Sequence, residues 1–133
     1  MLITEIQAQI NKLQEQVNIL TIERTKFNWE DAPTIVEING SWWVLGPEAP
    51  EELYWNDAVA WCDSVGGRLP PREVLLHAYV NEDIRTEFTA ADYWSSTEFT
   101  ATYAWAQNFS SGAQNDDSKT AAFFVRAVRR LDI

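Results

Sequence analysis

A regular apolar repeat in the first twenty residues constrains this chain more than any other feature. Isoleucine, leucine and valine recur at alternating spacings of three and four, at Ile3, Ile6, Ile10, Leu13, Val17 and Leu20. This spacing is a heptad repeat, in which the first, third and fifth of these residues occupy position a and the others position d. We therefore predict a coiled-coil helix over residues 1–27, with Phe27 continuing the d series.

The residues in and beside the seam indicate how the helix associates. Isoleucine at both a and d favours three strands over two, so we expect a homotrimer. The flanking e and g positions carry the uncharged side chains of Gln7, Gln9, Gln14 and Gln16. Such flanks give little charge-based selection between partners, which suits association of identical chains. Two alternatives remain open, namely a helix that packs on its own domain and one that docks into a larger fibre.

The rest of the chain shows the mixture of helix and strand signals typical of one α+β domain. We interpret residues 28–33 as a linker and residues 34–133 as the domain. The Asn39-Gly40 pair between TIVEI and SWWVLG predicts a β-hairpin, because both turn residues accept positive φ. Helical spacing predicts helices over 55–65 and 72–80, the first of them ending at Gly66-Gly67. Strands are predicted over 93–96, 103–109 and 121–131, with a polar loop, SSGAQNDDSK, before the last.

Tryptophan and cysteine positions predict part of the core. We expect four of the seven tryptophans to be buried: Trp42, Trp61, Trp94 and Trp105. The chain has one cysteine, Cys62, which excludes an intrachain disulfide. We expect Cys62 to pack as a small buried hydrophobic residue.

The charge balance excludes several classes of partner. The net charge is −10 and the pI is near 4.4, which argues against binding to nucleic acid or to anionic membranes. The basic cluster Arg126, Arg129 and Arg130 is too small to reverse this. No apolar run approaches the roughly 18 residues of a membrane span, so we expect no membrane insertion. Residues 1–10 lack the pattern of a secretory signal, so we expect assembly in the cytoplasm.

Six short motifs together resemble one domain family. They are WNDAVAWC, GGRLPPREVL, YWSSTE, the pair Ala104-Trp105, FSSG and FVRAVRR, in that order between Ser41 and Leu131. In this order and spacing they resemble the C-terminal domain of collagen-like bacterial adhesins, a C-type-lectin-like module also found in phage tail fibres. The resemblance implies two helices packed on a small antiparallel sheet. It also implies that a long loop region and the last strands carry binding.

The chain departs from that family at two points. Family members have a cysteine inside the VRxVR strand that pairs with one on the first helix, but Ala127 stands there, which leaves Cys62 alone. The calcium-binding lectin signature is also missing from the late strands. Asn115, Asp116 and Asp117 offer clustered oxygens that could ligate calcium, but their spacing is irregular, so we expect no metal and no cofactor.

An enzymatic function has little support in the sequence. The lectin-like fold includes formylglycine-generating oxidases, but those need active-site cysteines that this chain lacks. The sequence has no recognisable nucleophile–base pair, phosphate loop or zinc spacing. We therefore expect no catalytic residues.

The binding candidates are polar and aromatic residues of the late segments. Tyrosine, asparagine and serine on loops of a rigid scaffold make adaptable contacts with proteins or sugars. We place the candidates in the 98–103 turn and the 110–117 loop, with one at the end of the strand between them. They are Glu98, Phe99, Thr100, Thr102, Tyr103, Asn108, Ser110, Gln114, Asn115 and Asp116.

The combination of a predicted coiled-coil stem (residues 1–27) with an adhesin-like domain (residues 34–133, the head) leads to a functional hypothesis. We expect a phage tail-fibre or tail-tip subunit whose head binds a host-surface glycan or protein, located in the virion tail beside other fibre proteins. The main alternative is a structural virion protein that decorates the particle and binds no receptor. A bacterial adhesin module is a third possibility, which the missing secretory signal disfavours.

Overall fold

The computed structural model describes residues 6–9 and 27–132. Residues 6–9 are helical, and Ile6 of the predicted seam is 51% exposed in the single chain. The other predicted seam residues, Ile3, Ile10, Leu13, Val17 and Leu20, lie outside the described residues, so the coiled coil stays a prediction. None of the described helices is long and apolar enough to span a membrane.

The head begins with the hairpin that the Asn-Gly pair predicts. After the short 3-10 helix η1 (Trp29–Asp31), strand β1 (Thr34–Ile38) pairs antiparallel with β2 (Ser41–Glu48). The turn residues Asn39 and Gly40 have φ of 52° and 82°, which confirms the predicted turn. The last strand, β6 (Arg126–Asp132), pairs antiparallel with the other edge of β2. The resulting three-stranded sheet has the order β1-β2-β6.

Two helices follow, as the sequence pattern predicts, and one further helical turn comes after them. Helix α2 (Trp55–Ser64) ends just before Gly66, which takes the positive φ of 79° that suits glycine. Helix α3 (Arg72–Val80) follows Pro71, and α4 (Glu82–Arg85) adds one turn. Helix α3 contacts β1, β3 and β4, while α2 contacts β3 and β6. The helices therefore join the two halves of the head.

A second antiparallel sheet forms the rest of the head, with the order β3-β4-β5. Strand β3 is Asp92–Glu98, β4 is Tyr103–Asn108 and β5 is Gln114–Ser118. The prediction of an uninterrupted polar loop between the last two strands was wrong, because β5 lies within it. Its sequence, QNDDS, has low intrinsic strand propensity, but its backbone pairs with β4 from Tyr103–Ser118 to Gln107–Gln114. As an edge strand, β5 leaves polar side chains in solvent.

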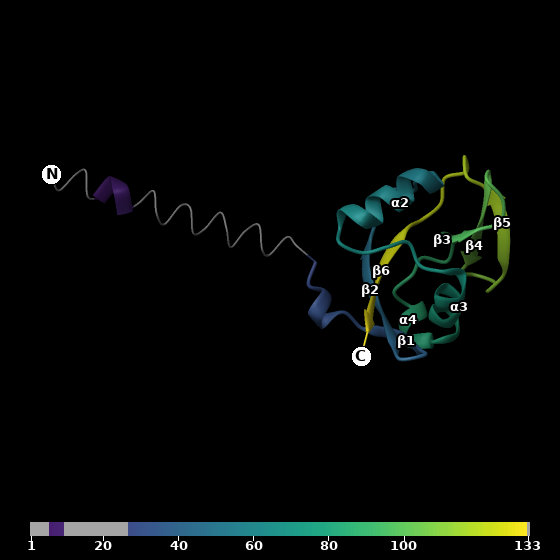
Figure 1. Ribbon diagram of the computed structural model, residues 1–133, viewed down its shortest axis with the longest axis horizontal. Coiled ribbons are helices and arrows are strands. Elements are labelled where there is room, and N and C mark those ends of the chain that lie inside the picture. Colours follow the sequence, from purple (N-terminus) through teal and green to yellow (C-terminus); the bar gives the residue numbers. More distant parts are fainter. Residues whose placement is uncertain (1–5, 10–26, 133) are drawn as a thin grey trace.

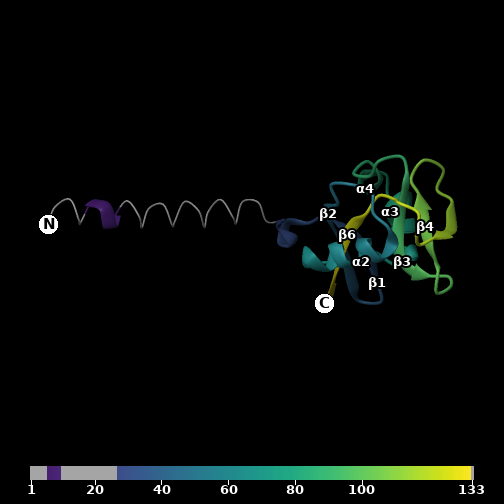
Figure 2. The ribbon, with the colours of Figure 1, turned by 90° about the horizontal axis from the view of Figure 1, so that it is seen from above.

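The observed α+β class, with helices beside antiparallel sheets, agrees with the sequence analysis, but two small sheets replace the one expected. The 123–128 segment joins the parts through bridges between Leu53 and Phe123, between Tyr93 and Phe124, and between Arg68 and Val128. Figures 1 and 2 show β3 and β4 at the end of the head away from η1, whereas the C-terminal end of β6 lies on the same side as η1.

The burial of tryptophans differs from the prediction at one strand. Trp94 is fully buried as expected, and Trp61 and Trp105 are half-buried. Trp42, however, is 41% exposed, and its neighbour Trp43, at 7%, is the core residue. Successive strand side chains point to opposite faces, so the two tryptophans lie on opposite faces of β2, and at this end of the strand only Trp43 is covered. The motif contained no signal that showed which one.

The core also includes Cys62 and a residue of the predicted linker. Cys62 is fully buried and forms no disulfide, as expected, and burial raises the pKa of its thiol to about 12. Trp29 is 9% exposed and its Nε1 donates to the carbonyl oxygen of Val65 at 3.1 Å. The residues before β1 are therefore anchored to the head by this side chain.

The adjacent tryptophans provide a matched test of the β2 register. We predict that Trp43→Ala lowers the free energy of unfolding by about 3–5 kcal/mol, because it empties a buried site. Trp42→Ala on the opposite face should cost within about 1 kcal/mol. Urea unfolding followed by circular dichroism measures both. Equal losses for the two variants would contradict the observed register.

Candidate functional site

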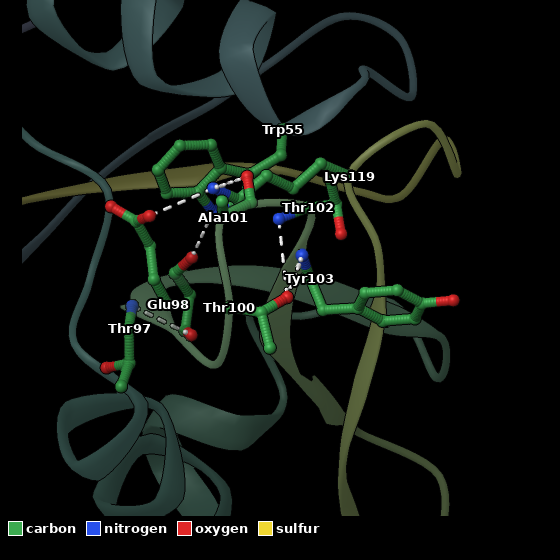
Figure 3. Close-up of polar contacts among 9 residues, drawn as sticks. Trp55, Thr97, Glu98, Thr100, Ala101, Thr102, Tyr103 and Lys119 are labelled. Atoms are coloured by element: carbon green, nitrogen blue, oxygen red, sulfur yellow. Dashed lines mark hydrogen bonds and ion pairs between the residues drawn. The ribbon is translucent and has the colours of Figure 1, made fainter.

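The turn between β3 and β4 is held by its own hydrogen bonds (Figure 3). The backbone N–H groups of Phe99 and Thr100 both donate to the carbonyl oxygen of Tyr103, at 2.9 and 3.1 Å. The hydroxyl oxygen of Thr100 accepts from the N–H groups of Thr102 and Tyr103, at 3.3 and 3.0 Å. Five candidate residues, Glu98, Phe99, Thr100, Thr102 and Tyr103, thus lie in or beside one ordered turn.

Lys119, just after β5, contacts this turn through both its side chain and its backbone. Its Nζ lies 2.9 Å from Glu98 Oε2 and 2.9 Å from the carbonyl oxygen of Ala101, and its backbone N–H donates to Thr102 at 2.9 Å. The same Nζ lies 4.2 Å from the centroid of the Trp55 ring, a cation–π contact. The Lys119 side chain is only 12% exposed. The turn is therefore tied to both β5 and α2.

An aromatic platform adjoins the turn on the outer face of the second sheet. Phe99 is 57% exposed and Tyr103 is 42% exposed. The Phe99 ring packs edge-on against the half-buried Trp105, with centroids 5.6 Å apart. The guanidinium of Arg72 stacks on Trp105, with Cζ 3.6 Å from the ring centroid. Phe99, Tyr103, Trp105 and Arg72 are called the distal platform below.

Internal hydrogen bonds hold Arg72 in place and engage the candidate Gln114. Arg72 Nε donates to Gln114 Oε1 at 2.9 Å, and Gln114 Nε2 donates to the Arg72 carbonyl at 2.7 Å and to Gln107 Oε1 at 2.8 Å. Gln107 is fully buried. Gln114 therefore holds Arg72 of the distal platform in position. It lies on β5, and not in a loop as the sequence had suggested.

Asn108 likewise serves the turn that follows β4. Its Oδ1 accepts from the backbone N–H groups of Ser110 and Ser111 at 2.8 and 2.7 Å, and its Nδ2 donates to Asp92 at 3.0 Å. These bonds fix the start of the β4–β5 connection. Among the candidates of this segment, Ser110 remains exposed.

The other acidic and amide candidates lie along edge strand β5. Asn115 and Asp116 are exposed, and Asp116 stands opposite Trp105 in the strand pairing. The pKa of Asp117 is raised by its burial and further by the charges of Asp92 and Asp116. Within residues 6–9 and 27–132, no group of three or more His, Cys, Asp or Glu side chains is arranged to hold a metal ion.

A groove of about 410 Å³ is lined in part by Trp55, the residue whose ring Lys119 contacts. Its walls come from α2, the 67–69 segment and β3, and its lining includes Trp55, Asn56, Val59, Arg68, Leu69 and Ser96. The indole Nε1 of Trp55 donates to the carbonyl oxygen of Ser95 at 2.8 Å, which fixes the ring. The groove is mostly apolar with polar groups at its rim, as ligand sites commonly are.

The structure adds site residues that sequence reasoning missed. From the sequence alone, no binding role was expected for Trp55, Arg72 or Lys119, and Trp105 was expected in the core. All of them meet through contacts between segments far apart in the chain, such as the 42-residue separation of Arg72 and Gln114. A local sequence pattern contains no signal for such contacts.

Comparison with known proteins does not show which family the chain belongs to. No family model and no curated protein matches it. Among solved structures, a crystal structure of botrocetin is similar, with a TM-score of 0.48 and 11% sequence identity, covering 82% of this chain and 98% of that chain. Similarity at this level does not bear on what this chain binds.

The bracing by Lys119 is open to direct test. We predict that Lys119→Ala speeds hydrogen exchange of the Phe99 and Thr100 amides about tenfold, because the turn loses its contacts with Glu98, Ala101 and Trp55. Glu98→Ala, the control, removes only an ion pair with a half-exposed carboxylate and should change exchange by about twofold or less. Exchange rates by NMR decide between them. The same rates in both variants and the unmodified chain would show that Lys119 does not brace the turn.

Proposed function

We propose that this chain is a host-attachment subunit of a phage tail fibre or tail tip, with a C-type-lectin-like head that binds a host-surface glycan or protein. The observation that carries the proposal is the braced β3–β4 turn, which displays Phe99 and Tyr103 to solvent beside the Arg72–Trp105 stack. This surface belongs to the sheet at the end of the head away from the 27–31 segment (Figures 1 and 2).

The physical properties of the distal platform favour binding. Exposed aromatic side chains on a rigid support lose little conformational entropy on binding and bring large contact area. Only Nε of the Arg72 guanidinium donates a hydrogen bond within the described residues, which leaves its two terminal nitrogens as donors for a ligand. Aromatic faces next to fixed donors suit a sugar or a polar protein surface.

The stem would supply avidity. Individual contacts of a small exposed surface are weak, and display of three heads on one stem raises apparent affinity without new contacts. The heptad repeat over residues 1–27 supports this arrangement. It also accounts for a head in which η1, which contains the anchoring Trp29, lies at the end away from β3 and β4 (Figure 1).

The second candidate is a structural virion protein that binds no receptor. The same exposed aromatics favour it, because Phe99 and Tyr103 could equally be covered by another virion protein. Competition for adsorption separates the two functions. A purified receptor binder blocks infection of its host, whereas a decoration protein leaves infection unchanged.

Binding by the distal platform leads to a mutational prediction. We expect Phe99→Ala and Tyr103→Ala each to weaken binding to an array of bacterial glycans and outer-membrane proteins at least about tenfold, as interface hot spots do. Val80→Ala provides the control, since Val80 is 68% exposed on α3, away from the platform. Undiminished binding by both platform variants would place the receptor site elsewhere.

The stem leads to a separate prediction on mass. Size-exclusion chromatography with light scattering should give three times the 15.2 kDa of one chain. Leu13→Asp, which puts a charge at a d position, should give a monomer, whereas Ala8→Asp at an outward f position should remain trimeric. A monomer for the unmodified chain would refute the trimeric stem.

A further inference from the structure

A second candidate site lies where the 66–68 segment meets β6, and the fold gathers arginines there from these two distant segments. The backbone of Arg68 exchanges hydrogen bonds with Val128, at 2.8 and 2.9 Å, which sets the 66–68 segment beside β6. A pocket of about 290 Å³ opens there, lined by Gly66, Gly67, Arg68, Arg129 and Arg130. No acidic side chain lines this arginine pocket, although the chain has 20 acidic residues against 10 basic ones.

The guanidinium of Arg129 is fixed at one wall of the pocket. Its Nε and Nη2 donate to the carbonyl oxygen of Gly66, at 3.0 and 2.8 Å, and its Cζ lies 4.5 Å from the centroid of the Trp29 ring. A Cβ at position 66 would lie 2.9 Å from Arg129 Nη2, so the glycine provides the room that the guanidinium occupies. This charge is therefore pre-positioned.

Arg68 differs from the other cations described. Arg72, Arg85, Arg126, Arg129 and Lys119 each donate hydrogen bonds through their charged groups. The guanidinium of Arg68, by contrast, makes no hydrogen bond or ion pair within residues 6–9 and 27–132. It is steered only by the Trp43 ring, with Cζ 5.4 Å from the centroid. Its donors are free for a ligand.

We propose that the arginine pocket binds an oxyanion, the phosphate or carboxylate group of a ligand. Like charges brought together repel, and an oxyanion between them removes that cost while forming charge-assisted hydrogen bonds. The volume accommodates the anionic group and part of the molecule that carries it. The pocket shares no lining residue with the distal platform, and its Arg129 stacks on Trp29 of η1, so it is separate from the proposed receptor surface.

Titration of the whole chain with inorganic phosphate and, in a separate arm, with acetate tests the pocket. At constant ionic strength, the NMR signals of the Gly66 and Gly67 amides should shift and saturate with at least one of the two anions, but not with chloride. Saturation by phosphate identifies a phosphate site. Saturation by acetate but not by phosphate identifies a carboxylate site. Arg68→Gln should weaken binding about tenfold or more, because it removes the free guanidinium. If that variant does not fold, Arg130→Gln replaces it.

Arg85→Gln makes the same change of charge on α4, outside the pocket, and should leave the affinity within about twofold. If the unmodified chain shows no saturable shift, the proposal is overturned. Equal weakening of anion binding by Arg68→Gln and Arg85→Gln would also overturn it, because it would indicate diffuse electrostatic attraction. The outcome is independent of receptor binding, because no receptor enters the experiment. Loss of platform binding by Phe99→Ala with intact anion binding would separate the two sites.

Discussion

The head depends on the 123–128 segment, which pairs with several separate parts of the chain. Ala49 donates to Val125 at 2.8 Å, Leu53 to Phe123 at 2.9 Å, Trp94 to Phe124 at 3.0 Å and Arg68 to Val128 at 2.8 Å. Each bond joins residues tens of positions apart, so each requires closure of a long loop before it contributes. The segment contributes to the first sheet, because β6 pairs with β2, and is linked to the second, because Tyr93 of β3 is bridged to Phe124.

The same segment explains why the two candidate surfaces lie apart. Where it is bridged to Tyr93, it fixes β3, and the braced turn and distal platform follow from that strand. Where it continues into β6, it brings Arg129 beside Gly66 and Trp29. Tight packing accompanies this approach, since a Cβ at Gly46 would lie 2.3 Å from the Trp29 ring and 2.6 Å from the Ala127 carbonyl oxygen. The backbone around Gly46, Trp29 and Ala127 is thus close-packed, while the β3–β4 turn is exposed.

Local signals predicted the elements better than they predicted their environment. The Asn39-Gly40 turn and the two helices follow from backbone preferences that act over a few residues. The choice between Trp42 and Trp43 depends on which of them joins the buried cluster that includes Val74 and Leu75 of α3, and the strand β5 depends on pairing with β4. For the site, the β3–β4 turn was identified from its composition, but Arg72 and Lys119 were not. Both act through partners in other segments, Trp105 and Gln114 for the first, Glu98 and Trp55 for the second.

Most of the few cations in this acidic chain share one structural role, contact with an aromatic ring. Six of them stack on aromatic rings, in the pairs Arg68–Trp43, Arg72–Trp105, Arg85–Tyr79, Lys119–Trp55, Arg126–Phe88 and Arg129–Trp29. A ring face holds a cation without neutralising it, so the positive charge remains available to further partners. In most of these pairs a backbone carbonyl, an amide or a carboxylate then completes the contact, and the cation becomes part of the scaffold. Arg68 lacks that second partner within the described residues. Cation–π stacking therefore orients the guanidinium of Arg68 as it orients the other five cations, but the N–H donors of Arg68 have no acceptor within the described residues.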